Sequence, residues 1–216
     1  MIDTLILLFG LTGLLMSIKS RIKTIINILS LQGVILFLII LFSHKASLSL
    51  SYLFLIFETL IIKALFIPSL LNKILLKNSV DRETEPYIPN FYSLVISSFI
   101  LFSGITISNY YAPFSVNMTP LFFGVSFSAI LTSLFFITTK KKLLTHVIGF
   151  AMLENGIFLF SLAIADEMPL IVNLGVLLDV FIAVFILGLL IGKINTVFHD
   201  TSSCTLCNLK DCGCDD

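Results

Sequence analysis

The chain has 216 residues, of which 57% are hydrophobic and only 12% are charged, and its formal net charge is zero. Soluble domains are nearer to about 25% charged. The composition therefore excludes a soluble globular protein, and we expect no nucleic-acid partner. It predicts an integral membrane protein whose main partner is the lipid bilayer.

Seven apolar segments follow one another along the chain, the first of them short and the third long. A helix needs about 20 mainly apolar residues to cross a bilayer. The pattern therefore predicts an all-α, polytopic membrane protein with about seven transmembrane helices. The segments cover residues 4–18, 25–43, 49–76, 91–108, 120–138, 143–165 and 170–193.

The basic residues predict an orientation. Of the thirteen Lys and Arg, all but Lys45 and Lys63 follow the first, third, fifth or seventh segment. Cytoplasmic loops collect Lys and Arg, so we expect the N-terminus outside and the C-terminus in the cytoplasm of a prokaryotic inner membrane. The residues on the cytoplasmic side are Lys19, Arg21, Lys23, Lys73, Lys77, Arg82, Lys140, Lys141, Lys142, Lys193 and Lys210.

A weak internal repeat suggests how the segments are organised. The second and sixth segments can be aligned so that Gln32-Gly33 meets Asn155-Gly156. Both aligned units would start on the same side, which makes the repeat parallel and argues against inverted-repeat transporters. Apolar segments match one another easily, so duplication and chance similarity both remain open.

This reading divides the chain into four parts. Residues 1–77 would form a three-helix N-terminal unit, and residues 78–118 a cytoplasmic loop with a linking helix. Residues 119–195 would form a second three-helix unit, followed by a cysteine-rich cytoplasmic tail at 196–216.

Charged residues lie inside the predicted helices: Glu58, Lys63, Glu154 and Asp179. At 1.5 Å per residue, all of them fall in the middle third of a roughly 30 Å hydrocarbon core. Each charge at that depth costs about 2.5–3.5 kcal/mol on insertion scales, and such groups by default mark ion or proton pathways. The alternative is a purely structural role in helix packing. His146, at the cytoplasmic end of its helix, is placed either to pass protons inward or only to be solvated.

The third segment predicts a local irregularity. Glu58 and Lys63 are five residues apart, about 140° around an α-helix, so Lys63 should find its partner on another helix or another subunit. Pro68 has no N–H to donate to the carbonyl of Ala64 and can kink the helix. A freed carbonyl beside an ammonium predicts a hydrated spot.

Glu154 and Asp179 lie at similar depth on consecutive antiparallel helices with a short connection. We therefore expect them to face each other or a shared water chain. Two carboxylates cannot easily both ionise there, so one should hold a proton unless Lys63 or a partner subunit supplies a positive charge. Gly149 and Gly156 should give the sixth segment a smooth packing face.

All four cysteines fall in the tail: Cys204, Cys207, Cys212 and Cys214. In the cytoplasm they would stay reduced, which argues against disulfides. Four thiolates can hold zinc or an iron–sulfur cluster, although this spacing matches no standard pattern. A metal site and a disordered thiol-rich tail both remain open.

Three stretches carry a resemblance to a known family: IIKALFIPSLL, GFAMLENG and LLDVFIAVFILGLLIGKI. They resemble the E component of hydrogenase-4 and formate-hydrogenlyase-type membrane complexes, and the resemblance extends over all seven segments. That family is similar in turn to the small K subunit of respiratory complex I, over the last three segments, and to the C subunit of multisubunit cation/proton antiporters.

The resemblance implies roles for particular residues. In the K subunit, two successive helices carry buried glutamates on the proton-transfer axis. Asp179 falls where the second of these lies, and the first falls one turn before Glu154. Lys63 and Pro68 match the third helix of the family, whereas Glu58 and the cysteine tail match nothing in it.

The implied function is that of a non-redox membrane subunit of an oxidoreductase complex, without catalytic activity of its own. Antiporter-like subunits and a hydrogenase-like or quinone-linked module would be its partners. Buried carboxylates and a lysine would extend a proton or cation path, and no cofactor is expected in the membrane part. A small stand-alone secondary transporter and a purely structural membrane subunit are the alternatives.

Overall fold

The computed structural model of the chain describes residues 1–43, 56–77, 86–111 and 120–164. Apart from isolated bridge residues, the regular structure within these ranges is helical. The predicted seventh segment, Asp179 and the four cysteines lie outside the described residues.

The described helices coincide with six of the seven predicted segments, the third of them from residue 56 onward. Five helices are long and apolar enough to cross a membrane, and α1 is a shorter apolar helix. The all-α membrane prediction is thus confirmed for this part of the chain, while the count of seven spans stays a prediction. The bounds are α1 Ile2–Ile18, α2 Ile22–Ser43, η1 Glu58–Phe66, α4 Ile67–Lys77, α5 Asn90–Tyr111, α6 Pro120–Thr139 and α7 Leu143–Ile164.

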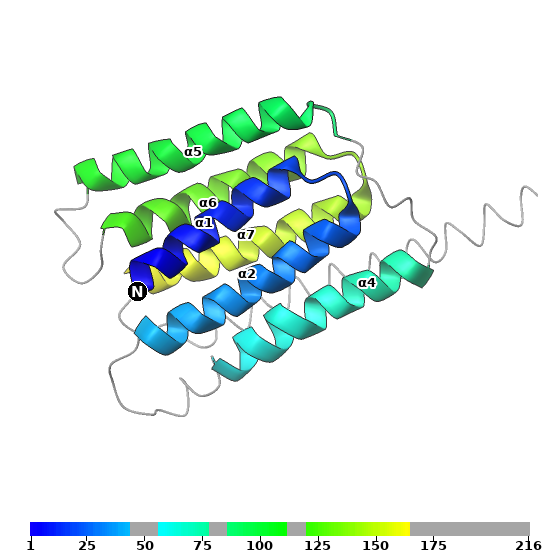
Figure 1. Cartoon of the computed structure of the whole chain (residues 1–216), viewed down its shortest axis with the longest axis horizontal. Helices are drawn as coiled ribbons and strands as arrows, with labels where there is room; N and C mark the ends of the chain where they lie inside the picture. The colour runs from blue at the N-terminus through cyan, green and yellow to red at the C-terminus, as the bar shows by residue number, and fades with distance from the viewer. Residues whose placement is uncertain (44–55, 78–85, 112–119, 165–216) are drawn as a thin grey trace, which may run out of the picture.

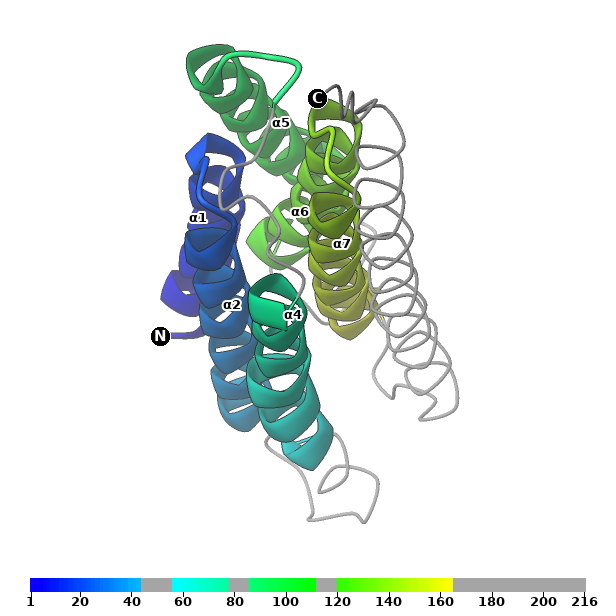
Figure 2. The ribbon, with the colours of Figure 1, turned by 90° about the vertical axis from the view of Figure 1, so that its right-hand side faces the viewer.

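The helices lie side by side in one bundle (Figure 1). α1 packs against α2, α5 and α6, and α2 packs against α7 and the continuous helix formed by η1 and α4. α5 lies at the top and α4 at the bottom of the described bundle, with α1, α2, α6 and α7 between them (Figure 1). Seen from the side, α1 and α2 lie to the left and α6 and α7 to the right (Figure 2). Within each of the pairs α1 with α6 and α2 with α7, the helices run in the same direction (Figure 1).

Two apolar clusters form the core, one above the other along the bundle. The first cluster takes its α2 residues from Ile22 to Leu29 and its α7 residues from Leu144 to Met152. The second takes them from Ile35 to Ile40 and from Phe158 to Ala163. The positions between, 30–34 on α2 and 153–157 on α7, belong to neither cluster, and they carry the polar groups described below.

Glycines let α7 approach α6 closely, as the sequence predicts. A Cβ added to Gly149 would lie 2.6 Å from Ile137 Cγ1, and one added to Gly156 would lie 3.2 Å from the backbone nitrogen of Ile130. Ile130 and Ile137 both belong to α6. α7 therefore packs on α6 with one face, which leaves another face for its carboxylate.

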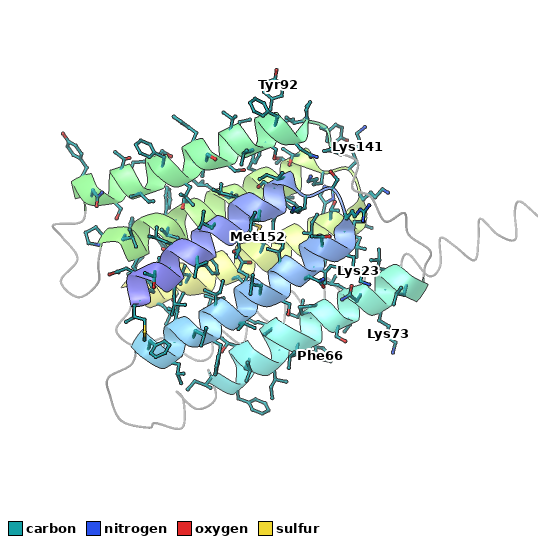
Figure 3. All side chains as sticks on the ribbon, viewed as in Figure 1. Lys23, Phe66, Lys73, Tyr92, Lys141 and Met152 are labelled. Carbon is teal, nitrogen blue, oxygen red and sulfur yellow. The ribbon has the colours of Figure 1, made fainter. Side chains whose placement is uncertain are left out.

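The basic residues gather at one end of the bundle. Lys23, Lys73 and Lys141 lie at the same end (Figure 3), and the N-terminus lies at the other (Figure 1). These lysines lie on or beside different helices, so the arrangement agrees with the predicted clustering on one side of a membrane.

Candidate functional site

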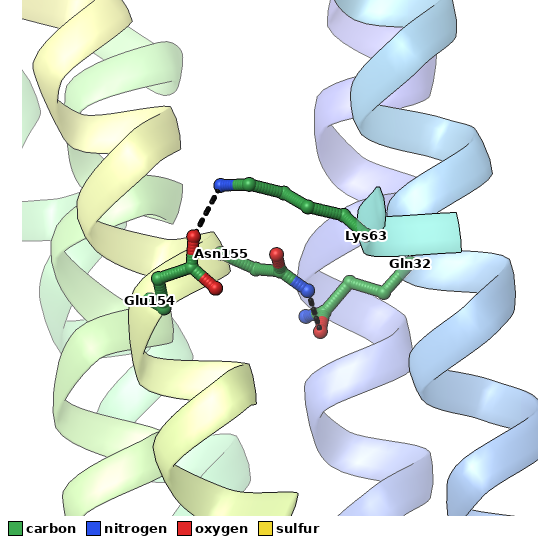
Figure 4. A network of polar contacts seen from close by, with 4 residues as sticks. All are labelled: Gln32, Lys63, Glu154 and Asn155. Atoms are coloured by element: carbon green, nitrogen blue, oxygen red, sulfur yellow. Dashed lines mark hydrogen bonds and ion pairs between the residues drawn. The ribbon is translucent and has the colours of Figure 1, made fainter. Parts of the chain in front are cut away.

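A buried ion pair joins the third helix to α7. Lys63 Nζ lies 2.6 Å from Glu154 Oε1, and the two side chains are 1% and 2% exposed. The ammonium also lies 4.2 Å from the centre of the Phe158 ring. Figure 4 shows the lysine reaching across from η1 to the carboxylate. The predicted partner of Lys63 on another helix is thus Glu154.

An amide pair lies next to the ion pair. Asn155 Nδ2 on α7 donates to Gln32 Oε1 on α2 over 3.3 Å, and both residues are buried. The four side chains meet between α2 and α7 (Figure 4). Gln32 and Asn155 are the positions that the proposed repeat aligns, so the aligned polar residues of the two units contact each other.

The backbone that carries Lys63 is a π-helix over Glu58–Phe66. Its i→i+5 hydrogen bonds place residues five apart about one turn from each other. The angle of about 140° expected for Glu58 and Lys63 assumed an α-helix, so that expectation is wrong for this segment. The side chain of Glu58 lies outside the described residues.

The carbonyl left free by Pro68 has a partner. Ser30 on α2 donates its hydroxyl to the carbonyl oxygen of Ala64 over 2.6 Å. The carbonyl is therefore not left without a donor, because a side chain of the neighbouring helix takes the place of the missing N–H. The hydrated spot beside Lys63 stays a prediction. The helix continues beyond Pro68 as α4.

Gly33 lets α2 lie directly against this turn. A Cβ added at Gly33 would lie 2.9 Å from the Cα and backbone nitrogen of Ala64, and 3.0 Å from the carbonyl carbon of Lys63. Real Cβ atoms do not come so close to backbone atoms. Ser30 and Gly33, almost one turn apart on α2, thus hold the Lys63–Ala64 peptide.

The charges of the site balance within the described residues. Sequence reasoning left open whether Lys63 or a partner subunit supplies a positive charge to the buried acids, and the structure places the Lys63 ammonium against Glu154. Apart from the two atoms of the ion pair, two polar atoms of this site have no hydrogen-bond partner among the described residues, the acceptor Glu154 Oε2 and the donor Gln32 Nε2. A buried acceptor of this kind is available to a proton or to a water molecule.

His146 is the one other predicted site residue whose side chain the structure describes, and it does not contact the pair. His146 Nδ1 lies 2.8 Å from the carbonyl oxygen of Lys142, the residue before α7. It precedes Glu154 by eight residues, about 12 Å along an α-helix. The pairing of Glu154 with Asp179 concerns a residue outside the described ranges. Within those ranges no His, Cys, Asp or Glu cluster has the geometry of a metal site.

Sequence reasoning missed a buried lysine at the end of α6. Lys140 is 1% exposed, and its Nζ lies 5.4 Å from the centre of the Phe136 ring. Its backbone forms an isolated bridge with Pro86. Burial lowers the pKa of Lys140 from its ordinary value of 10.5. Within the run Lys140–Lys142 nothing in the sequence distinguished the buried lysine.

The comparisons with known proteins give one informative similarity. No family model matches the chain, and no solved structure matches it. The chain is similar to the uncharacterized protein Rv0085 of Mycobacterium tuberculosis, with 27% identity over 202 residues. The similarity covers 93% of this chain and 92% of that protein. It therefore extends over nearly the whole of both chains, and it names no activity.

Proposed function

We propose that this chain is a non-redox membrane subunit of a hydrogenase-like or complex I-like energy-converting complex. In it, the Lys63–Glu154 pair forms part of a path for protons or cations. The observation that carries the proposal is this ion pair, fully buried between helices that are long enough to cross a membrane. The resemblance to the hydrogenase-4 E component supports the same reading.

The geometry suggests how the pair handles a proton. With Lys63 charged, Glu154 is held as a carboxylate whose Oε1 faces the ammonium and whose Oε2 is the open acceptor. A proton that arrives at Oε2 cancels the negative charge and with it the attraction to Lys63. Departure of that proton, with Asp179 as the proposed next carrier, restores the pair. The Lys63 ammonium is thus held by Glu154 when the carboxylate is charged and released when the carboxyl carries a proton.

The proposed setting follows from the same reasoning. The basic end of the bundle would face the cytoplasm of a prokaryotic inner membrane, with the N-terminus outside. Antiporter-like membrane subunits and a hydrogenase-like or quinone-linked module would flank the chain. The pair would then continue a hydrated path that runs along the membrane through several subunits.

Proton translocation by the assembled complex tests the proposal. Glu154→Gln places an amide oxygen where the carboxylate now meets Lys63 Nζ, and Asp179→Asn keeps the volume of the side chain. Both variants should assemble, yet lower the translocation coupled to the redox reaction, whereas Asp3→Asn at the start of α1 should translocate at the parental rate. Parental translocation in both variants would mean that the buried acids are structural.

Purification in mild detergent distinguishes a subunit of a complex from a stand-alone transporter. Copurification with antiporter-like and redox subunits supports the complex. A homogeneous monomer or homodimer that binds a substrate without other subunits would instead identify a stand-alone transporter.

A further inference from the structure

We infer that Ser30 is a positioning residue for Lys63: its hydroxyl replaces the amide that Pro68 lacks and holds the π-helical turn that aims Lys63 at Glu154. The role of this contact in proton transfer rests on the proposed function. The contact between Ser30 and Ala64 does not, because it depends only on α2 and the third helix, as the structure describes them.

The first step of the argument is the backbone. The i→i+5 bonding of the π-helix reaches Ile67, whose N–H donates to the carbonyl of Ile62. At the return to α-helical bonding, the carbonyl of Ala64 would accept from the N–H of residue 68, but proline has none. Ser30 Oγ lies 2.6 Å from that carbonyl oxygen and comes from α2. A carbonyl in a membrane without a partner costs several kcal/mol. The serine therefore stabilises a backbone shape that the third helix cannot stabilise by itself.

The second step connects this shape to the ion pair. Ala64 is the residue after Lys63, so a shift of its carbonyl moves the peptide on which the lysine side chain begins. Gly33 leaves no room for that peptide to approach α2 further. Ser30 keeps it from moving away. Between them the two residues fix the starting point of a side chain whose ammonium must stay 2.6 Å from Glu154 Oε1.

A hydrophobic carbodiimide reports the contact directly. The Glu154 carboxyl adds to dicyclohexylcarbodiimide to form an O-acylisourea. The Lys63 amine then attacks the acyl carbon, dicyclohexylurea leaves with the carboxyl oxygen, and an amide joins the two side chains. A carboxyl without an amine in reach rearranges to an N-acylurea instead. Proteolysis and mass spectrometry of the full chain in bilayer discs give the ratio of the two products.

The parent should yield the Lys63–Glu154 cross-link. Ser30→Ala should lower the ratio of cross-link to N-acylurea about five-fold, the change that about 1 kcal/mol of lost hydrogen bonding produces. Ser30→Thr keeps the hydroxyl and should restore the parental ratio. Ser133→Ala is the matched control, because Ser133 is buried but donates to Ala129 within its own helix.

A double-mutant cycle guards against a general loss of folding. Pro68→Ala restores the missing N–H, so Ser30→Ala should change the product ratio less in that background than in the parent. An unchanged ratio in Ser30→Ala, equal effects in both backgrounds, or no cross-link in the parent would each overturn the inference. Parental proton translocation in Glu154→Gln with an intact serine effect would overturn only the proposed function.

Discussion

Lys63 lies between Glu154 and Phe158, two residues one turn apart on α7. The carboxylate meets the ammonium at 2.6 Å, and the ring face lies 4.2 Å from it. One face of α7 therefore supplies both a negative charge and an aromatic surface to the same cation. The same level of α2 and α7 also carries the amides of Gln32 and Asn155 and the hydroxyl of Ser30.

The ion pair predicts non-additive effects on stability. Removal of one partner of a buried pair leaves an uncompensated charge and costs about 3–5 kcal/mol. Lys63→Met and Glu154→Leu should each lower the thermal stability of the purified protein strongly, and the double variant should recover most of the loss. Glu154→Gln should be milder, since its amide oxygen still accepts from the ammonium.

Retention of monodisperse protein after heating, measured for the parent, both single variants and the double variant, checks this prediction. Two single effects that simply add in the double variant would show that the two side chains are not coupled.

Gly33 should tolerate a methyl group much less well than Gly13. At Gly33 the added Cβ would meet backbone atoms of Ala64 at 2.9 Å, whereas at Gly13 it would meet the flexible end of Met152 at 3.3 Å. Overpacking against a rigid neighbour costs about 1–3 kcal/mol. Gly33→Ala should therefore unfold at a clearly lower temperature than Gly13→Ala in the same detergent. Equal unfolding temperatures would contradict the close approach of α2 to the π-helix.

Lys140 should make stability depend on pH. Burial lowers its pKa in the folded protein below the ordinary 10.5, so between these two values the unfolded chain binds more protons. Burial of the charged Lys140 therefore lowers the free energy of unfolding at neutral pH, and this loss is recovered as the pH rises toward 10.5. Lys140→Met should be more stable than the parent at neutral pH, and the advantage should shrink with rising pH. Melting temperatures of both proteins across this range measure it, with the exposed Lys141→Met as the control.

The cysteine tail gives a prediction on metal content. If Cys204, Cys207, Cys212 and Cys214 bind a metal, the purified chain should carry about one equivalent of zinc or one iron–sulfur cluster, because thiolate ligands and tail folding depend on each other. Replacement of the cysteines by serine should remove the metal and leave the membrane helices folded. Elemental analysis and alkylation decide the matter, since four freely alkylated thiols in metal-free protein would exclude the site.

The sequence predicted the helices well and the contacts between them only in part. Apolar length alone located six described helices, because a bilayer imposes that length on any spanning helix. The glycine face of α7 was also predictable, since Gly149 and Gly156 lie seven residues apart and close to one face. Pairing was harder: Lys63 and Glu154 were both identified, but nothing in a single sequence joins two positions so far apart.

The π-helix was the main surprise. Pro68 indicated a missing backbone hydrogen bond, and from it we predicted a kink and a hydrated spot. The structure has a π-helical turn there instead of α-helical bonding. The answer depended on Ser30, a hydroxyl on a different helix that carries no signal of its own. Tertiary contacts, not the propensity of residues 58–66, decide the backbone there.

The separation of the ion pair along the chain has a consequence for biosynthesis. Glu154 follows Lys63 by 91 residues, and at about 5–20 residues per second a ribosome needs about 5–18 s to make that stretch. During this interval the carboxylate that will pair with the lysine has not yet been made. The nascent chain can shelter the charge by extending the long lysine stem toward the interface. Once α7 has been made, Glu154 can attract the ammonium back into the bundle. The last described helix thus completes a site whose other side chains come from α2 and the third helix.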